Sequence, residues 1–115
     1  MIWEVRGNLG RAIRFRRNEI RLVRRLFKIS TPEEIQEGLV VYDWSDLSDR
    51  LDLLAGLYCE AGYLDKAIRT LRQSKKLCAE HGIPFDGADM LEEYLAEKKK
   101  LGRKTVSAAR KRKLA

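Results

Sequence analysis

Residues that usually carry catalytic or metal chemistry are scarce in this chain of 115 residues, which has one histidine and two cysteines. Its two prolines and eight glycines exclude a collagen-like or linker-rich protein. No run of 18 apolar residues is present, so we expect no membrane-spanning helix. The first residues carry Glu4, Arg6, Arg11 and Arg14 and lack an apolar stretch, so we expect no secretory signal there.

The scarcity of reactive side chains argues against an enzyme. His81 stands beside Gly82 at a predicted helix end, where we expect it to be solvated and to interact with the helix dipole. Cys59 and Cys78 have no further cysteine or histidine at metal-ligand spacing, and no phosphate loop or nucleophile motif is present. We therefore predict no enzymatic activity, no catalytic or metal-binding residue and no cofactor.

Four aspartates and the two cysteines receive structural interpretations. The aspartates, three residues apart, are expected to cap a helix and favour its N-terminus rather than to bind a metal ion: Asp43, Asp46, Asp49 and Asp52. The cysteines are predicted on opposite helices of a hairpin, roughly 18 Å apart along the axis, whereas a disulfide needs Cα atoms within about 7 Å. Free thiols favour a reducing, cytoplasmic compartment.

The residues that are abundant favour helix. Apolar residues make up 44% and charged residues 36% of the chain; Leu, Ala, Arg, Lys and Glu dominate, while Val and Thr are sparse. We predict an all-α protein of four or five helices. Residues 1–101 should form a single helical domain, and residues 102–115 a basic, flexible tail.

Charge is distributed unevenly along the chain. The net charge is +7 over residues 1–30, −9 over 31–97 and +9 over 98–115. An acidic middle therefore lies between two basic ends. The ends either neutralise the middle within the fold or bind an acidic partner, and the tail, with few apolar residues, is the less able to dock on its own chain.

Residues 9–29 are predicted to form one amphipathic helix. At about 100° per residue, one side of this helix carries Leu9, Ala12, Ile13, Ile20, Val23, Leu26 and Phe27. That apolar arc is widened by Phe15, Leu22 and Ile29. The opposite face carries six cations and no acid, namely Arg14, Arg17, Arg21, Arg24, Arg25 and Lys28. Cations four residues apart repel one another, so we expect this face to be a binding surface rather than a buried ion-pair network.

The remaining helices are read from caps and apolar spacing. Thr31, Pro32 and Glu34 form a capping box ahead of a short helix over 33–42, although 39–42 also has strand character. Ser45 or Ser48 is expected to cap a helix over 47–61, and Gly62 to end it. A second helix should follow over 63–81, and a last one over 87–101 that Gly102 closes.

Residues 48–81 resemble a tetratricopeptide repeat. Leu51, Leu54, Ala55 and Tyr58 precede the turn at Gly62, and Ala67 and Leu71 follow it. The resemblance implies two antiparallel helices that bind a peptide or helix in a concave groove. It departs from the family pattern at Ser74, where alanine is usual, and in the absence of a closing proline.

The sequence GNLGRAIR at 7–14 echoes GYLDKAIR at 62–69. If the echo marks a repeat, the N-terminal helix is the second half of a unit whose first half is missing. A repeat hairpin cannot bury its face alone, so the helices over 9–29 and 87–101 would serve as its neighbours.

These patterns favour a helical interaction or adaptor module that docks on a protein partner or on itself. Its basic ends are predicted to contact RNA, DNA or another polyanion without sequence preference. The predicted polyanion-binding residues are Arg14, Arg17, Arg21, Arg24, Arg25, Lys28, Lys98, Lys99, Lys100, Arg103, Lys104, Arg110, Lys111, Arg112 and Lys113. The alternative is membrane-surface binding through helix 9–29, which ranks lower because the same apolar arc is needed for the core.

Overall fold

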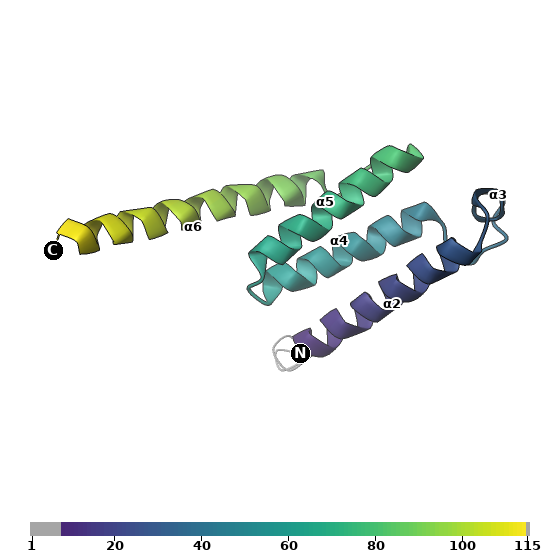
Figure 1. Ribbon diagram of the computed structural model, residues 1–115, viewed down its shortest axis with the longest axis horizontal. Helices are drawn as coiled ribbons and strands as arrows, with labels where there is room; N and C mark the ends of the chain where they lie inside the picture. Colours follow the sequence, from purple (N-terminus) through teal and green to yellow (C-terminus); the bar gives the residue numbers. More distant parts are fainter. Residues whose placement is uncertain (1–7, 115) are drawn as a thin grey trace.

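The computed structural model describes the backbone of residues 8–114 and the side chains of residues 8–102, and over this range the chain is all-α, as predicted. Five helices occupy it: α2 (Leu9–Ile29), α3 (Pro32–Gln36), α4 (Trp44–Glu60), α5 (Leu64–His81) and α6 (Ala88–Leu114). The long helices lie side by side in the order α2, α4, α5, α6, and each runs opposite to the one before it (Figure 1). The antiparallel hairpin of α4 and α5 is at the centre.

Helix α2 has the predicted bounds and packs on α4. Its buried side chains are Ile20, Val23 and Phe27, whose spacing of three and four residues places them on one side of the helix. Ser30 follows the helix in extended conformation, and its hydroxyl donates to the Leu26 carbonyl at 2.8 Å. The buried face is narrower than the apolar arc of the sequence, because Phe15, Leu22 and Ile29 are exposed.

Helix α3 begins as predicted but is shorter. Thr31 accepts from the Glu34 backbone N–H at 3.1 Å, and the Glu34 carboxylate accepts from the Thr31 N–H at 2.9 Å. The prediction of a helix over 33–42 was wrong, since α3 ends at Gln36. Gly38, with φ of +77°, takes a left-handed conformation that glycine adopts without strain, and residues 39–42 are neither helix nor strand.

The start of α4 also differs from the prediction of a serine cap. Asp43 is the N-cap: its carboxylate accepts from the Asp46 N–H at 2.8 Å, and Asp46 accepts from the Asp43 N–H at 2.9 Å. Ser48 lies inside the helix, where its hydroxyl is buried 2.8 Å from that of Ser74. Asp43 and Asp46 therefore stabilise the helix start as expected, whereas Asp49 and Asp52 lie farther along α4 and not at its start.

The hairpin core contains the side chains that the sequence predicted. Leu51, Leu54 and Tyr58 of α4 and Ala67, Ile68 and Leu71 of α5 are all buried. Helix α4 ends before Gly62, whose φ of +88° reverses the chain into α5. Both cysteines are free, as expected: Cys59 is half-buried and Cys78 is buried.

Helix α6 packs on α5, burying Leu91 and partly burying Tyr94 and Leu95. The prediction that Gly102 closes this helix was wrong, because the helical backbone runs through Gly102 to Leu114. One glycine within a helix costs only about 1 kcal/mol relative to alanine, which the flanking helix-forming residues offset. The far half of α6 extends beyond the other helices (Figure 1).

Candidate polyanion-binding groove

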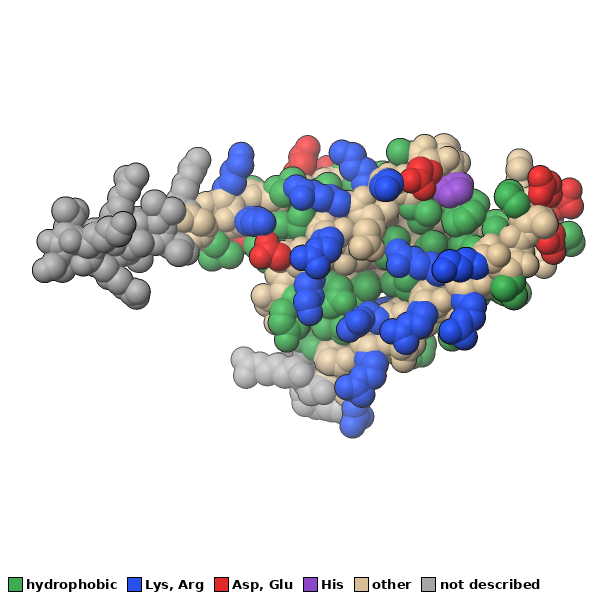
Figure 2. All heavy atoms as spheres, in the orientation of Figure 1, with side chains coloured by type: hydrophobic (Ala, Val, Ile, Leu, Met, Phe, Trp, Pro, Cys, Tyr) green, Lys and Arg blue, Asp and Glu red, His purple; other side chains and the backbone are tan. Residues whose placement is uncertain are grey.

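A groove lies between α2 and α5, with α4 as its floor. Its volume is about 680 Å³, and Figure 2 looks onto the face where basic side chains of α2 and α5 border the apolar floor. Ile20, Leu51, Leu54 and Tyr58 supply the apolar part of the lining. We call this feature the basic groove, defined by Arg17, Ile20, Arg21, Arg24, Arg25, Lys28, Leu51, Leu54, Tyr58, Lys66, Arg69, Thr70 and Gln73.

Seven cations line the basic groove, and no acid is among the described residues that do so. Helix α2 provides Arg17, Arg21, Arg24, Arg25 and Lys28, and helix α5 provides Lys66 and Arg69. All seven side chains are exposed. Repulsion among these cations therefore raises the free energy of the unoccupied groove. An anion that enters the groove reduces this repulsion.

The helical period explains how the two walls are built. Arg17, Arg21, Arg24 and Lys28 follow one another at intervals of four, three and four residues, which aligns them along one side of α2. Lys66, Arg69 and Gln73 repeat the same spacing on α5. The walls meet where an Arg24 guanidinium N–H (Nη2) donates to Gln73 Oε1 at 3.4 Å.

Lys66 is held at the groove by aromatic rings. Its ammonium lies 4.9 Å from the centre of the Tyr63 ring and 5.8 Å from that of Tyr58, distances at which ring faces attract cations. The two rings meet edge to face, with centres 6.4 Å apart. These contacts position a positive charge at the end of the groove beside the turn of the hairpin.

Acidic side chains pair with cations outside the groove. Glu19 contacts Arg16 at 2.8 Å and Arg50 at 3.3 Å. Although its partial burial acts in the opposite direction, the hydrogen bond from Arg16 and the charges of both arginines lower the pKa of Glu19. Two further ion pairs within the described residues join Lys76 to Glu80 and Lys98 to Asp65.

The ion pairs help to decide whether the basic N-terminal block neutralises the acidic middle of the chain or binds an acidic partner. Within residues 8–102, no groove cation lies in an ion pair with an acid of the middle block. The acid that does lie on α2, Glu19, pairs away from the groove. This arrangement favours an exposed binding face over an internal ion-pair network. The groove cations extend their charged ends into solvent, where an anionic partner can reach them.

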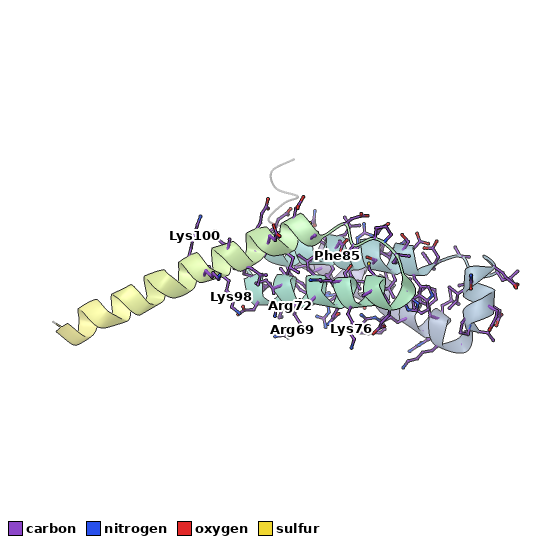
Figure 3. All side chains as sticks on the ribbon, turned by 90° about the horizontal axis from the view of Figure 1, so that it is seen from above. Arg69, Arg72, Lys76, Phe85, Lys98 and Lys100 are labelled. Atoms are coloured by element: carbon purple, nitrogen blue, oxygen red, sulfur yellow. The ribbon has the colours of Figure 1, made fainter. Side chains whose placement is uncertain are left out.

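The structure brings together five of the predicted polyanion-binding residues, Arg17, Arg21, Arg24, Arg25 and Lys28. Arg14 is exposed but does not line the groove. Lys98 reaches toward α5, where it contacts Asp65 at 3.0 Å, whereas Lys100 points away from α5 (Figure 3). Lys99 is exposed on α6. The side chains of Arg103, Lys104, Arg110, Lys111, Arg112 and Lys113 lie outside the described residues.

Sequence reasoning missed Lys66 and Arg69. Their spacing was visible, but nothing in the sequence placed α5 across a groove from α2. Figure 3 shows Arg69, Arg72 and Lys76 projecting from the same side of α5. The basic face of the protein therefore extends beyond the groove along this helix.

His81 lies exposed at the C-terminal end of α5, as expected, but it also makes an aromatic contact that the sequence did not suggest. Although exposed, its ring stacks on Trp44 with centres 3.8 Å apart and planes 9° apart, and Trp44 in turn contacts Phe27 at 4.4 Å. The stack closes the end of the layer where α2, α4 and α5 meet. Residues 8–102 contain no group of three His, Cys, Asp or Glu side chains placed to hold a metal ion.

Comparisons with known proteins return nothing. No protein-family model, curated protein or solved structure matches this chain. The likeness of residues 48–81 to a tetratricopeptide repeat therefore stays a prediction. Among the described helices, none is both long and apolar enough to cross a membrane.

Proposed function

We propose that this protein is a non-enzymatic helical interaction module whose basic groove binds a polyanion, with nucleic acid as the first candidate. The observation that carries the proposal is the convergence of seven exposed cations, from helices distant in sequence, on one groove without an acid. Such a surface neutralises phosphates and releases their counterions. Free thiols are compatible with action in a reducing compartment such as the cytoplasm.

Backbone recognition is favoured over base reading. Five of the seven groove cations are spread along about three turns of α2, and Arg binds phosphate oxygens through its planar fork of donors. No recognised base-reading motif is present in the sequence. We therefore expect RNA and DNA of different sequences to bind with similar affinity, and the basic residues of the C-terminal end to add further phosphate contacts.

The experiment is a fluorescence anisotropy titration of duplex DNA, duplex RNA and single-stranded RNA with the full chain at low salt. The groove variant Arg21→Gln/Arg69→Gln removes one cation from each wall. Its matched control, Arg11→Gln/Lys75→Gln, removes one exposed cation from each of the same helices outside the groove. We expect the groove variant to bind at least about tenfold more weakly than the control, equivalent to about 1.4 kcal/mol.

Two outcomes would contradict this function. In one, none of the three nucleic acids binds at low salt. In the other, the groove variant and its control lose affinity equally, which would mean that net charge rather than the groove attracts the polyanion.

One structural observation supports a second candidate function, which is binding to a membrane surface. Phe15, Leu22 and Ile29 are 63%, 63% and 77% exposed, so the core does not use the whole apolar arc of α2. Exposed apolar side chains beside arginines suit an anionic bilayer surface. Co-sedimentation with phosphatidylserine vesicles tests this candidate, and unchanged sedimentation of Leu22→Gln would contradict it.

A further inference from the structure

The helical layer has two unlike edges. At one edge, α6 turns charged side chains outward, among them Glu92, Glu93 and Lys100, all exposed. At the other edge, α2 is covered on one side by α4 and carries Phe15, Leu22 and Ile29 exposed. In stacked helical proteins a polar outer face closes the end of an array. Among the side chains of residues 8–102, the α6 edge is closed in this sense, and the apolar side chains of the α2 edge are left uncovered.

The exposed apolar residues of α2 form one stripe. Phe15, Leu22 and Ile29 are seven residues apart, so two helical turns separate each from the next and all three share a side. Leu26, half-buried, fills the place four residues after Leu22. We call these four side chains the edge stripe. From Phe15 to Ile29 it is about 21 Å long at 1.5 Å per residue, which matches a partner helix of about four turns.

The width of the edge stripe favours a helix over a lipid surface. Membrane-surface helices present a broad apolar face, but α4 already covers the part of α2 that holds Ile20, Val23 and Phe27. The apolar side chains of α2 that α4 leaves uncovered have the seven-residue spacing of a helix–helix interface. A partner helix could bury it completely, whereas a flat bilayer would contact three separated side chains.

The charges beside the edge stripe determine which kind of partner helix can bind there. Arg11, Arg14 and Arg25 lie within roughly 80° of Leu22 around α2, and all three are exposed. On the other flank, Glu19 is already paired with Arg16 and Arg50. A second copy packed antiparallel through the same stripe would set these arginines against their equivalents, and like charges so placed disfavour association.

We infer that the α2 edge is a docking surface for an amphipathic helix of another protein that carries acidic residues beside its apolar stripe. The inference rests on the proposal that this protein is an interaction module, and it assigns the protein partner to a face other than the basic groove. Docking would continue the layer by one helix beyond α2. It would cover the edge stripe and pair Arg11 and Arg14 with carboxylates, while Arg25, which also lines the basic groove, lies at the border of the two surfaces.

The test uses the full chain and a labelled synthetic peptide of about six turns, with leucines spaced alternately by three and four residues and glutamates beside them. A second peptide has lysines in place of the glutamates. The edge variant is Phe15→Gln/Leu22→Gln, and its control, Leu39→Gln/Val41→Gln, replaces two exposed apolar residues outside the stripe. We expect the glutamate peptide to bind, and the lysine peptide and the edge variant each to weaken binding at least about tenfold, with the control unchanged.

Several results would overturn the inference. The first is no binding of the glutamate peptide, and the second is equal binding of both peptides. Loss of peptide binding in Arg21→Gln/Arg69→Gln but not in the edge variant would place the peptide in the basic groove. A dimer in sedimentation, or vesicle binding, that the edge variant abolishes would assign the edge to a second copy or to lipid.

The same set of variants separates this inference from the proposed function. The edge variant should retain nucleic-acid affinity, and the groove variant should retain peptide affinity. Failure of the nucleic-acid titration alone would leave the edge as a docking surface, and failure of the peptide titration alone would leave the groove as a polyanion site.

Discussion

The hydroxyl oxygens of Ser48 on α4 and Ser74 on α5 lie 2.8 Å apart at the centre of the hairpin. Ser74 is fully buried, and its hydroxyl also donates to the Ser48 carbonyl at 3.4 Å. The Ser48 hydroxyl lies 3.1 Å from the Cys78 thiol. The serine at position 74, which departs from the alanine usual in tetratricopeptide repeats, is therefore matched by a second serine on the facing helix.

Removing both members of this pair should destabilise the fold by less than the two single removals add up to. Ser74→Ala or Ser48→Ala leaves a buried hydroxyl with fewer partners, so each should lower the free energy of unfolding by about 1–3 kcal/mol. The double variant should lose less than the sum, because neither hydroxyl then needs the other. Urea unfolding of the four proteins measures this coupling, and simple additivity would contradict the hydrogen bond.

The packing of the hairpin predicts a larger loss at Leu54, which is 6% exposed. Leu54→Ala should lower the free energy of unfolding by about 2–5 kcal/mol, since a cavity adds to the lost burial. Leu53→Ala, one position away and 52% exposed, is the matched control and should change it little. Equal losses in the two variants would contradict the assignment of which face of α4 is buried.

Asp52 gives the fold a defined pH dependence. Burial raises its pKa; the neighbouring Ser74 side chain opposes the shift, and the charges of Asp49 and Asp86 add to it. The folded state therefore binds this proton more tightly than the unfolded state. The contribution of Asp52 to stability falls as the pH rises from the ordinary value of 3.8 through the raised value, because the folded protein then has to hold a partly buried charge.

Asp52→Asn should remove that loss. Near its ordinary pKa the variant and the parent should differ least, and the variant should gain in relative stability as the pH rises toward neutrality. Denaturant unfolding at a series of pH values gives the difference directly. Glu97→Gln, which removes an exposed carboxylate on α6 that does not act on Asp52, is the control for net charge. A difference that shrinks with rising pH would contradict the raised pKa.

The thiols should react at two rates. Cys59 is half-buried beside Tyr94, whose pKa is raised to about 12 by burial and by the neighbouring thiol. Cys78 is 1% exposed. In a thiol-modification assay of the native protein, Cys59 should react first and Cys78 only as the hairpin opens. The mass of the protein should be identical before and after reduction, and a gain of two hydrogen atoms on reduction would indicate a disulfide.

Some features followed from sequence because they are local. Helix α2, the Thr31 capping box and the buried faces of α4 and α5 depend on spacings within one segment, and each was predicted. The start of α4 was not, because Ser45, Ser48 and Asp43 are all suitable N-caps. Reciprocal hydrogen bonds with Asp46 make Asp43 the cap, and Ser48 is buried against Ser74. Gly102 within α6 likewise reflects the strong helix formers around it.

Only the part of the candidate site that lies within one helix could be predicted from the sequence. The cations of α2 share a face that the helical period reveals. Lys66 and Arg69 belong to the same groove only because α2 and α5 lie on opposite sides of α4, a relation that sequence spacing does not contain. The edge stripe was hidden as well, since Phe15 and Leu22 looked like core residues until the packing showed α4 covering a narrower face.

The central claim is that the cations of α2 and α5 act on phosphates from within one groove, and the salt dependence of binding tests it most directly. On duplex DNA, the logarithm of affinity should fall with the logarithm of salt concentration at a slope of about −0.9 per phosphate contacted. Arg17→Gln/Arg21→Gln/Arg24→Gln should flatten that slope by up to about three units, and deletion of residues 103–115 should flatten it further. Helix content should stay nearly unchanged. An unaltered slope in the triple variant, or a loss of folding stability above about 1 kcal/mol that marks these cations as internal ion-pair partners, would contradict the account.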